Sequence, residues 1–277
     1  MLGFAMTRSL SASLPGFMRQ AIRFLLPVDC AACGAPLADD PIPLFCAGCW
    51  RTVSPLTHPC CCRCDRPFPS PTATVYSPGH VCQSCAKRPP SYTRAWTLYP
   101  YLSPLQDAIC LFKYRGKVAL AASLARLMID RLPPLDSLDL IMPVPLHAQR
   151  LREREFNQSL LLADRVARHL KTPVSATNLI RIAPSPAQTT LSRKDRLKNL
   201  RGAFALHHPE SIAGKRILLI DDVFTTGTTV NECAKTLRKG GSGDVFVLTL
   251  GRTVDAATIP DRILARQPHH SPGEAGG

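Results

Sequence analysis

The chain has 277 residues, enough for one large domain or for a medium-sized domain with a smaller one beside it. It contains no run of about 18 uncharged apolar residues, so we expect no membrane-spanning helix. Arg19 and Arg23 interrupt the apolar segment 17–26, which favours a short amphipathic helix over a secretory signal and predicts a cytoplasmic protein. The formal charge of +14 predicts an anionic partner: nucleic acid, nucleotide phosphates or a membrane surface.

The composition changes near residue 90 and divides the chain into parts of different character. A region rich in Cys and Pro comes first, a linker-like stretch over 87–91 follows, and regular alternation of apolar and polar residues comes after it. We therefore expect a helical or flexible segment over 1–24, a cysteine-rich region over 25–90, an α/β domain over 91–256 and a flexible tail over 257–277.

Segments typical of strands and helices alternate through the second part of the chain. Strands are expected over 95–101, 138–144, 178–182, 203–206, 215–220 and 244–250. Helices are expected over 105–114, 118–132, 158–170 and 228–239. This alternation predicts an α/β fold in which helices cover both faces of a parallel sheet.

Most of the cysteines lie between Cys30 and Cys85, in a pattern that repeats itself. Two Cys-x2-Cys pairs make up each of two four-thiolate sets. The first set is Cys30, Cys33, Cys46 and Cys49, and the second is Cys61, Cys64, Cys82 and Cys85. Such pairs bring four sulfurs to a tetrahedral centre, the geometry that Zn²⁺ accepts at about 2.3 Å. Because four thiolates leave no open position, we expect two structural zinc ions, which would stabilise a segment with few large apolar residues.

The ligands of the second set are open to an alternative. Cys60 and Cys62 flank Cys61, so a shifted choice of ligands has to be considered. Cys61 with Cys64 keeps the two-residue spacing and is preferred. Reduced, free cysteines are the competing interpretation of both sets, and disulfides are rarer still in a reducing compartment.

A strand, a small-residue loop and a helix start follow one another between residues 215 and 239. The run of β-formers ends in Asp221 and Asp222, and Thr-Thr-Gly-Thr-Thr over 225–229 leads into the helix. This order aims backbone N–H groups at a phosphate, with help from the helix dipole and the threonine hydroxyls. The acids beside it would accept hydrogen bonds from sugar hydroxyls or help to order Mg²⁺. A threonine-capped helix after a core strand is the simpler alternative, but it leaves the acids unexplained.

The apolar run, Asp-Asp and Thr-Thr-Gly-Thr-Thr together resemble the signature of type I phosphoribosyltransferases. The resemblance implies that Asp221 and Asp222 hold the ribose 2′- and 3′-hydroxyls and carry the catalytic role of the site. It assigns the 5′-phosphate to Thr225, Thr226, Gly227, Thr228 and Thr229. The implied ligand is phosphoribosyl pyrophosphate (PRPP) or a related phosphorylated sugar, bound with Mg²⁺.

From about residue 24 to residue 253 the chain resembles a narrower group, the ComF family. Members combine a double zinc ribbon with a type I phosphoribosyltransferase-like domain and are associated with DNA uptake in competence. The family usually has glycine at the position of Glu155. Besides the cysteine pairs and the threonine loop, the likeness lies in Phe112-Lys113-Tyr114-Arg115-Gly116, Pro143-Val144-Pro145-Leu146-His147, Phe156-Asn157-Gln158-Ser159 and Gln188-Thr189, and in Arg196, Asn199 and Ala203-Phe204.

Three basic residues become candidate ligand contacts through these resemblances. Arg150 lies in 143–155, where such enzymes have a pyrophosphate loop, and a solvated charged loop is an equal alternative. Arg196 lies in the basic run 193–201, which resembles a loop that closes over the substrate in such enzymes. The run equally resembles a nucleic-acid-binding surface, and a plain amphipathic helix face is the simpler alternative. Lys113 is a candidate only through the family likeness, because a helix end favours cations in any case.

Two functions follow from these features. The first is a ComF-like protein that binds a ribose 5-phosphate or PRPP-type ligand in DNA uptake or DNA processing, with single-stranded DNA and DNA-uptake proteins as partners. The alternative is an active phosphoribosyltransferase, which transfers phosphoribosyl from PRPP to a nitrogen nucleophile while Mg²⁺ and arginines stabilise the leaving group. No aromatic-rich hood for a nucleobase is recognisable before Tyr92, which favours the first function.

Overall fold

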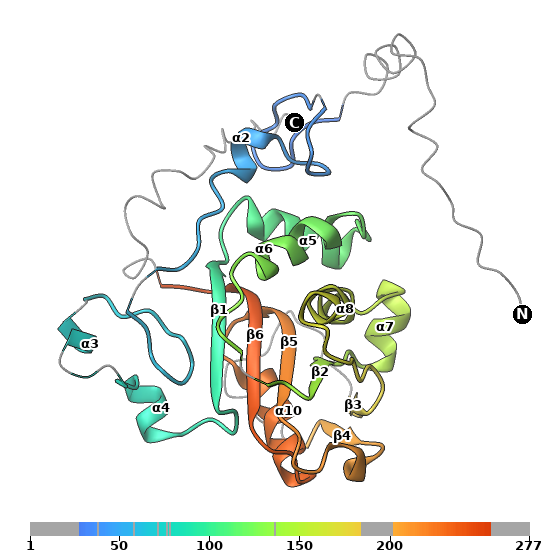
Figure 1. The fold of residues 1–277 in the computed structure, drawn as a ribbon. Coiled ribbons are helices and arrows are strands. Elements are labelled where there is room, and N and C mark those ends of the chain that lie inside the picture. The colour runs from blue at the N-terminus through green and yellow to red at the C-terminus, as the bar shows by residue number, and fades with distance from the viewer. Residues whose placement is uncertain are drawn as a thin grey trace, which may run out of the picture.

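The structure of the protein is a computed structural model (Figure 1). It describes residues 28–37, 39–57, 59–70, 72–75, 77, 79–135, 137–183 and 202–255. The predicted segments over 1–24 and 257–277, and the basic run that contains Arg196, lie outside these residues.

Four parallel strands form the central sheet, in the order β1-β6-β5-β2. They are β1 (Arg94–Pro100), β2 (Leu140–Pro143), β5 (Ile217–Phe224) and β6 (Val245–Arg252). β5 and β6 lie in the middle, where Ile220 pairs with Leu248, and most of their residues are buried. Strands that are buried on both faces need nearly continuous runs of apolar β-formers, and these segments have such runs. The predicted parallel sheet is confirmed.

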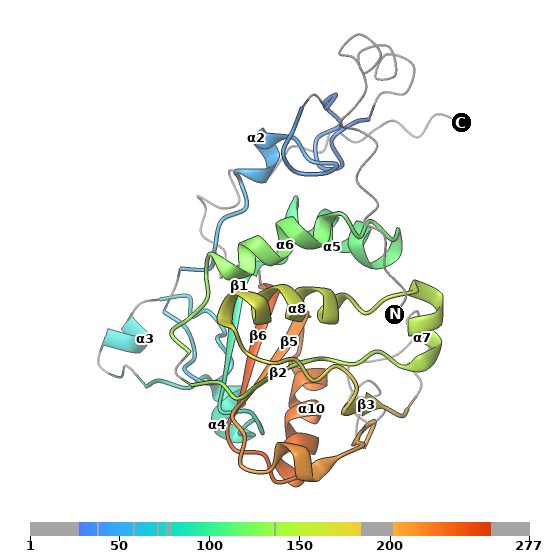
Figure 2. The same ribbon diagram turned by 45° about the vertical axis from the view of Figure 1, so that its right-hand side comes forward.

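Helices cover both faces of this sheet (Figure 2). The helices are α5 (Leu105–Tyr114), α6 (Leu120–Ile129) and α8 (Gln158–Leu170) on one face and α10 (Thr228–Lys239) on the other. Alternate residues of β5 divide between the two layers, with Leu218 and Ile220 in the cluster of the first three helices and Leu219 in that of α10. Within the described part of the chain, no helix combines the length and the apolar character that crossing a membrane would take.

Two of the predicted strands form outside the main sheet. β3 (Leu179–Arg181) and β4 (Phe204–Leu206) pair antiparallel with each other. β4 packs against α10, so the pair covers the α10 layer and does not widen the parallel sheet. Such short segments are recognisable as strands, but the choice of a neighbour depends on packing that their own sequence does not contain.

The segment after β2 is expected to be a loop from its sequence, and that expectation is wrong over Ala148–Arg154, which forms helix α7. His147 caps this helix, because its Nδ1 accepts a hydrogen bond from Gln149 N at 3.3 Å. Ala, Gln, Arg, Leu and Glu are all good helix formers, so local propensity explains the helix. Glu155 ends it in the left-handed region (φ 64°), a conformation that favours the glycine usual in the family.

The cysteine-rich region folds into two small lobes with short helices, α2 (Ala47–Trp50) in the first and α3 (Thr72–Val75) and α4 (Gln83–Lys87) in the second. Figure 1 shows α2 above α5 and α6, and α3 and α4 beside β1. The first lobe packs into the layer of α5, α6 and α8, and the second into the layer of α10. The second is also tied to the sheet by hydrogen bonds from Ala95 N to Arg63 O and from Arg252 Nη1 to Cys64 O, both 2.8 Å long.

Candidate functional site

The threonine loop, residues 225–229, joins the end of β5 to the start of α10. Thr228 is the first residue of the helix, as the sequence predicts. Gly227 has φ +74°, and a Cβ at this position would lie 2.4 Å from Phe224 Cζ, so both the backbone conformation and the space require glycine. The first N–H groups of an α-helix have no partner within the helix and, together with its dipole, form a binding site for anions such as phosphate.

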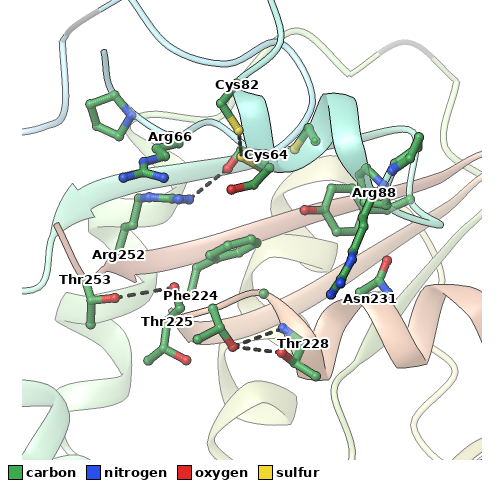
Figure 3. A pocket seen from close by; sticks show the side chains of 18 of the residues that line it. Cys64, Arg66, Cys82, Arg88, Phe224, Thr225, Thr228, Asn231, Arg252 and Thr253 are labelled. Atoms are coloured by element: carbon green, nitrogen blue, oxygen red, sulfur yellow. Dashed lines mark hydrogen bonds between the residues drawn. The ribbon is translucent and has the colours of Figure 1, made fainter. Parts of the chain in front are cut away.

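Threonine hydroxyls line the same loop (Figure 3). Thr226 Oγ1 and Thr228 Oγ1 are 2.8 Å apart, and Thr228 N donates to Thr226 Oγ1 at 3.4 Å. Thr253, just after β6, donates its N–H to Phe224 O at 3.1 Å and holds the start of the loop against the sheet. Thr225 and Thr226 are exposed. The loop is therefore shaped mainly by its own residues and is open to a phosphate from solution.

The two acids lie inside β5, which continues past them to Phe224, whereas the sequence predicts that the strand ends before them. Asp222 forms an ion pair with Lys113 of α5, with 2.7 Å between Oδ1 and Nζ, and the two side chains are only 8% and 16% exposed. Asp221 Oδ1 accepts hydrogen bonds from Ser159 Oγ of α8 and from Asp222 N, each at 3.0 Å. The acid pair is thus fixed by partners from two helices.

Burial dominates the electrostatics of the acid pair. It raises the pKa of Asp221 to about 7, and the neighbouring charge of Asp222 adds to this rise, whereas Lys113 and the hydrogen bond from Ser159 oppose it. Burial lowers the pKa of Lys113, but the carboxylates of Asp222 and Asp221 raise it, and the net result is a pKa above the usual value for lysine. Near neutral pH, Lys113 is therefore charged and Asp221 lies between its two protonation states.

Asn157 and Ser159 hold parts of this site in place and are not among the site residues predicted from the sequence. Asn157 Oδ1 caps α8 by accepting from Ser159 N at 3.0 Å, and its Nδ2 donates to Val144 O at 3.2 Å. Ser159 then orients Asp221. Gln158 is buried between them, and its Nε2 has no hydrogen-bond partner among the described residues. The sequence does contain a signal for the role of Asn157, because it precedes an apolar helical run and asparagine is a preferred helix cap.

The structure places the three basic candidates differently. Lys113 lies at the acid pair. Arg150 lies on α7 with its Nε 3.8 Å from Glu153 Oε2, and the described residues show no ion pair between it and either acid. Arg196 is not among the described residues. A role for Arg150 or Arg196 at a pyrophosphate therefore stays a prediction.

The two cysteine sets have the arrangement of tetrahedral zinc sites. In each set, all four sulfurs lie within 4.8 Å of one another. Cys33 and Cys46 bring their sulfurs to 3.9 Å in the first set, and Cys64 and Cys82 to 3.7 Å in the second. Four ligands at about 2.3 Å from a tetrahedral centre are about 3.8 Å apart, so the spacing suits zinc. Each set is complete with four thiolates, which is the composition of a structural site.

The second set contains Cys61, and its two neighbours are engaged elsewhere. Cys60 Sγ donates to Asp65 Oδ1 at 2.9 Å, and Cys62 Sγ donates to Gly79 O at 3.0 Å. The geometry therefore matches the preferred set of ligands and not a shifted one.

A groove of about 680 Å³ separates the threonine loop from the second cysteine lobe (Figure 3). Phe224 and Arg252 line it. The Arg252 guanidinium lies 4.7 Å from the centroid of the Phe224 ring and donates a hydrogen bond to Cys64 O. Arg88 extends from the cysteine lobe towards Asn231 of α10. The groove thus places the Arg88 side chain beside the start of α10, where it could contact an anionic group of a ligand longer than a single sugar phosphate.

The fold, the acid pair with its threonine loop and the two cysteine tetrads define a phosphoribosyltransferase-like domain joined to a double zinc ribbon. Residues 157–255 match the phosphoribosyl transferase domain family, and residues 21–86 match the double zinc ribbon domain family. Competence protein F of Haemophilus influenzae is 33% identical over 215 residues, which are 75% of this chain and 90% of that protein. DNA utilization protein YhgH of Salmonella typhimurium is 32% identical over 235 residues, 83% of this chain and 99% of that protein. The chain belongs to the ComF family.

Among solved structures, adenine phosphoribosyltransferase from Thermoanaerobacter pseudethanolicus is similar over 50% of this chain and 83% of that protein, with 17% identity and a TM-score of 0.32. This distant likeness concerns the fold alone.

Proposed function

We propose that the protein binds a ribose 5-phosphate or PRPP-type ligand at the threonine loop and the acid pair. The observation that carries the proposal is that both lie on one strand–loop–helix unit, with Asp221 and Asp222 in the second half of β5 and Thr228 at the start of α10. The loop supplies donors for the 5′-phosphate, and the acids accept hydrogen bonds from the ribose 2′- and 3′-hydroxyls. A hydrogen bond to a charged group contributes about 1.5–3 kcal/mol, so the acids would discriminate against a sugar that lacks one hydroxyl.

Calorimetric titration with two sugars tests this proposal. The protein should bind ribose 5-phosphate and should bind 2-deoxyribose 5-phosphate about ten- to hundredfold more weakly, because one carboxylate then lacks its hydroxyl. Asp222→Asn should weaken binding of ribose 5-phosphate by a similar factor. Asp164→Asn, an exposed position on α8, is the matched control and should bind like the wild type. No binding of ribose 5-phosphate, or equal binding of both sugars, would overturn the proposal.

We further propose that this binding serves DNA uptake or DNA processing in the cytoplasm, with single-stranded DNA and DNA-uptake proteins as partners. The names of the relatives, a competence protein and a DNA utilization protein, support this role. The groove of Figure 3 supports a nucleic-acid partner, because Lys87 and Arg88 of the second cysteine lobe line it together with the threonine loop.

Fluorescence anisotropy with a labelled single-stranded oligonucleotide over a salt series tests the nucleic-acid partner. The logarithm of the affinity should fall linearly with the logarithm of the salt concentration, as phosphate contacts require. Arg88→Ala should weaken binding, and Asp222→Asn should leave it nearly unchanged. If Asp222→Asn abolishes binding of both DNA and sugar phosphate, the two sites overlap.

Transfer of phosphoribosyl from PRPP to a nitrogen nucleophile is the second candidate function, and the acid pair beside a phosphate loop favours it. The bond from C1 to pyrophosphate would break with the electron pair leaving on pyrophosphate, and the nitrogen would form the new bond and lose a proton to solvent. Mg²⁺ carried by the pyrophosphate would stabilise the leaving group, together with arginines such as Arg150 and Arg196. Pyrophosphate release, measured with nucleobases, ammonia and oligonucleotides as acceptors, tests this function, and binding without release would exclude it for those acceptors.

Two structural zinc ions per chain are part of the proposal, one at each cysteine set. Metal analysis of the purified protein should find about two zinc ions per chain. Cys64→Ser should lower the content to about one. Cys60→Ser, which changes the thiol bonded to Asp65, is the matched control and should leave it at about two. Equal zinc loss in both variants would contradict this assignment of ligands.

A further inference from the structure

The acid pair already contains a cation. Lys113 Nζ lies 2.7 Å from Asp222 Oδ1, and both side chains are largely buried. Lys113 is in the last turn of α5, and the helix is anchored in the core by buried residues such as Ile109 and Phe112. The position of the ammonium is therefore fixed by packing as well as by the ion pair. Removing one partner of a buried ion pair leaves an unpaired buried charge, so the contact resists disruption.

The charges around this lysine nearly balance. Asp221 and Asp222 contribute two negative charges when both are ionised, and Lys113 contributes one positive charge, which leaves one negative charge in total. Protonation of Asp221 reduces that total to zero. A divalent cation would meet little net negative charge at this point.

These residues do not fit a directly bound Mg²⁺. The ion needs near-octahedral oxygen ligands at about 2.0–2.1 Å and takes them from one or two carboxylates and from water or phosphate. Asp222 Oδ1 already faces the ammonium of Lys113, and Asp221 Oδ1 accepts two hydrogen bonds, one of them from Ser159. An ion bound to either oxygen would also lie close to the charge of Lys113, and such repulsion is weakly screened in a buried site.

We propose that Lys113 is the built-in counter-ion of the sugar site, so that the acid pair binds ribose hydroxyls without a divalent cation. This inference rests on the proposed binding of ribose 5-phosphate. A carboxylate has several acceptor positions, so Asp222 can accept a hydroxyl while it is paired with Lys113. An ammonium has three N–H donors, of which the ion pair uses one. The ligand class is a pentose 5-phosphate with neighbouring hydroxyls, and Mg²⁺ matters only to ligands that carry it on a pyrophosphate.

Calorimetric titration of the wild-type protein with ribose 5-phosphate tests this inference. Magnesium is removed from the buffer with a chelating resin, because a soluble chelator such as EDTA would also extract zinc from the cysteine sets. The second buffer contains MgCl₂, with the ionic strength matched by NaCl. The affinities in the two buffers should agree within about twofold. An affinity at least about tenfold weaker without Mg²⁺ would overturn the inference.

A variant without the lysine charge gives a second readout. Lys113→Met keeps most of the side-chain length, and it should bind ribose 5-phosphate at least about tenfold more weakly than the wild type in the magnesium-free buffer. Added Mg²⁺ should restore part of that affinity, because the acid pair then lacks its own cation. Lys117→Met, an exposed position just after the same helix, should match the wild type in both buffers. A role of Lys113 in folding alone would give a loss that Mg²⁺ does not restore.

The outcomes separate this inference from the proposed function. No binding of ribose 5-phosphate by the wild type in either buffer would overturn the proposed function itself. Binding that requires Mg²⁺ would keep the proposed function and overturn the role of Lys113. The wild-type comparison decides even if Lys113→Met does not fold, which circular dichroism would show.

Discussion

The acid pair and the threonine loop are separated by two residues in sequence, yet they are held in different ways. Asp221 and Asp222 are fixed by Ser159 and Lys113, whose side chains come from two helices on one face of the sheet. The loop is exposed and is shaped largely by its own glycine and threonines. The difference indicates that tertiary packing sets the charge state of the acid pair, whereas local sequence sets the shape of the threonine loop. Four substitutions test that division.

The largest effect is expected from breaking the ion pair. Lys113→Met leaves Asp222 buried without a partner and should lower the free energy of unfolding by about 3–5 kcal/mol. Urea unfolding measures this change. Lys117→Met is the control and should stay within about 0.5 kcal/mol of the wild type. If both variants are equally stable, the ion pair does not stabilise the buried Asp222. Tertiary packing would then not set the charge state of the acid pair.

Gly227→Ala tests the loop. The left-handed backbone and the contact with Phe224 should together cost about 2–4 kcal/mol of unfolding free energy, and phosphate binding should be lost. Gly241→Ala is the matched control, because Gly241 has φ +87° but open space around it, and it should show only the backbone cost of about 1–2 kcal/mol. Equal costs at both positions would mean that the Phe224 contact does not define the loop.

The pH dependence of stability should reveal the buried acid. The folded protein keeps the proton of Asp221 up to about pH 7, whereas the unfolded chain releases it near its ordinary pKa of 3.8. Stability from this group is therefore fully present at low pH and is lost as the pH rises through that window. From about pH 5 to pH 7 the loss amounts to about 2–3 kcal/mol, at about 1.4 kcal/mol per pKa unit.

Asp221→Asn should lack that loss, so urea unfolding at several pH values should show the wild type losing more stability than the variant as the pH rises. Asp164→Asn, exposed on α8, should keep the wild-type dependence. Parallel curves for the wild type and Asp221→Asn would show that the carboxylate is solvated and that packing does not set its charge.

The smallest change in stability is expected from Thr226→Val. It removes the hydroxyl contact with Thr228, and because the site is exposed, the free energy of unfolding should fall by only about 0.5–1 kcal/mol. Affinity for ribose 5-phosphate should fall about tenfold, because the loop loses a donor to the phosphate. A large loss of stability with unchanged affinity would reverse the expected roles of the loop and the acid pair.

Sequence patterns predict most of the helices and strands, but fewer of the contacts between them. The start of α10 and the need for a glycine before it follow from the residues of the loop, because both depend on local backbone conformation. The extension of β5 past the acids does not follow, because charged residues are poor strand signals unless a neighbour such as Lys113 compensates them. Helix α7 does not follow from the sequence pattern either, because its many charged residues indicate a loop, although most of its residues are good helix formers.

The sequence by itself determined the two cysteine sets, the parallel sheet and the threonine loop, because ligand spacing, apolar periodicity and turn conformation act over a few residues. Only the tertiary structure decided that Ser159 and Lys113 are the partners of the acids, and that a groove separates the loop from the second cysteine lobe. Those partners lie far from β5 in the chain. Packing α5 and α8 on one face of the sheet brings them to it, and the low exposure there shifts the pKa values and fixes the ion pair.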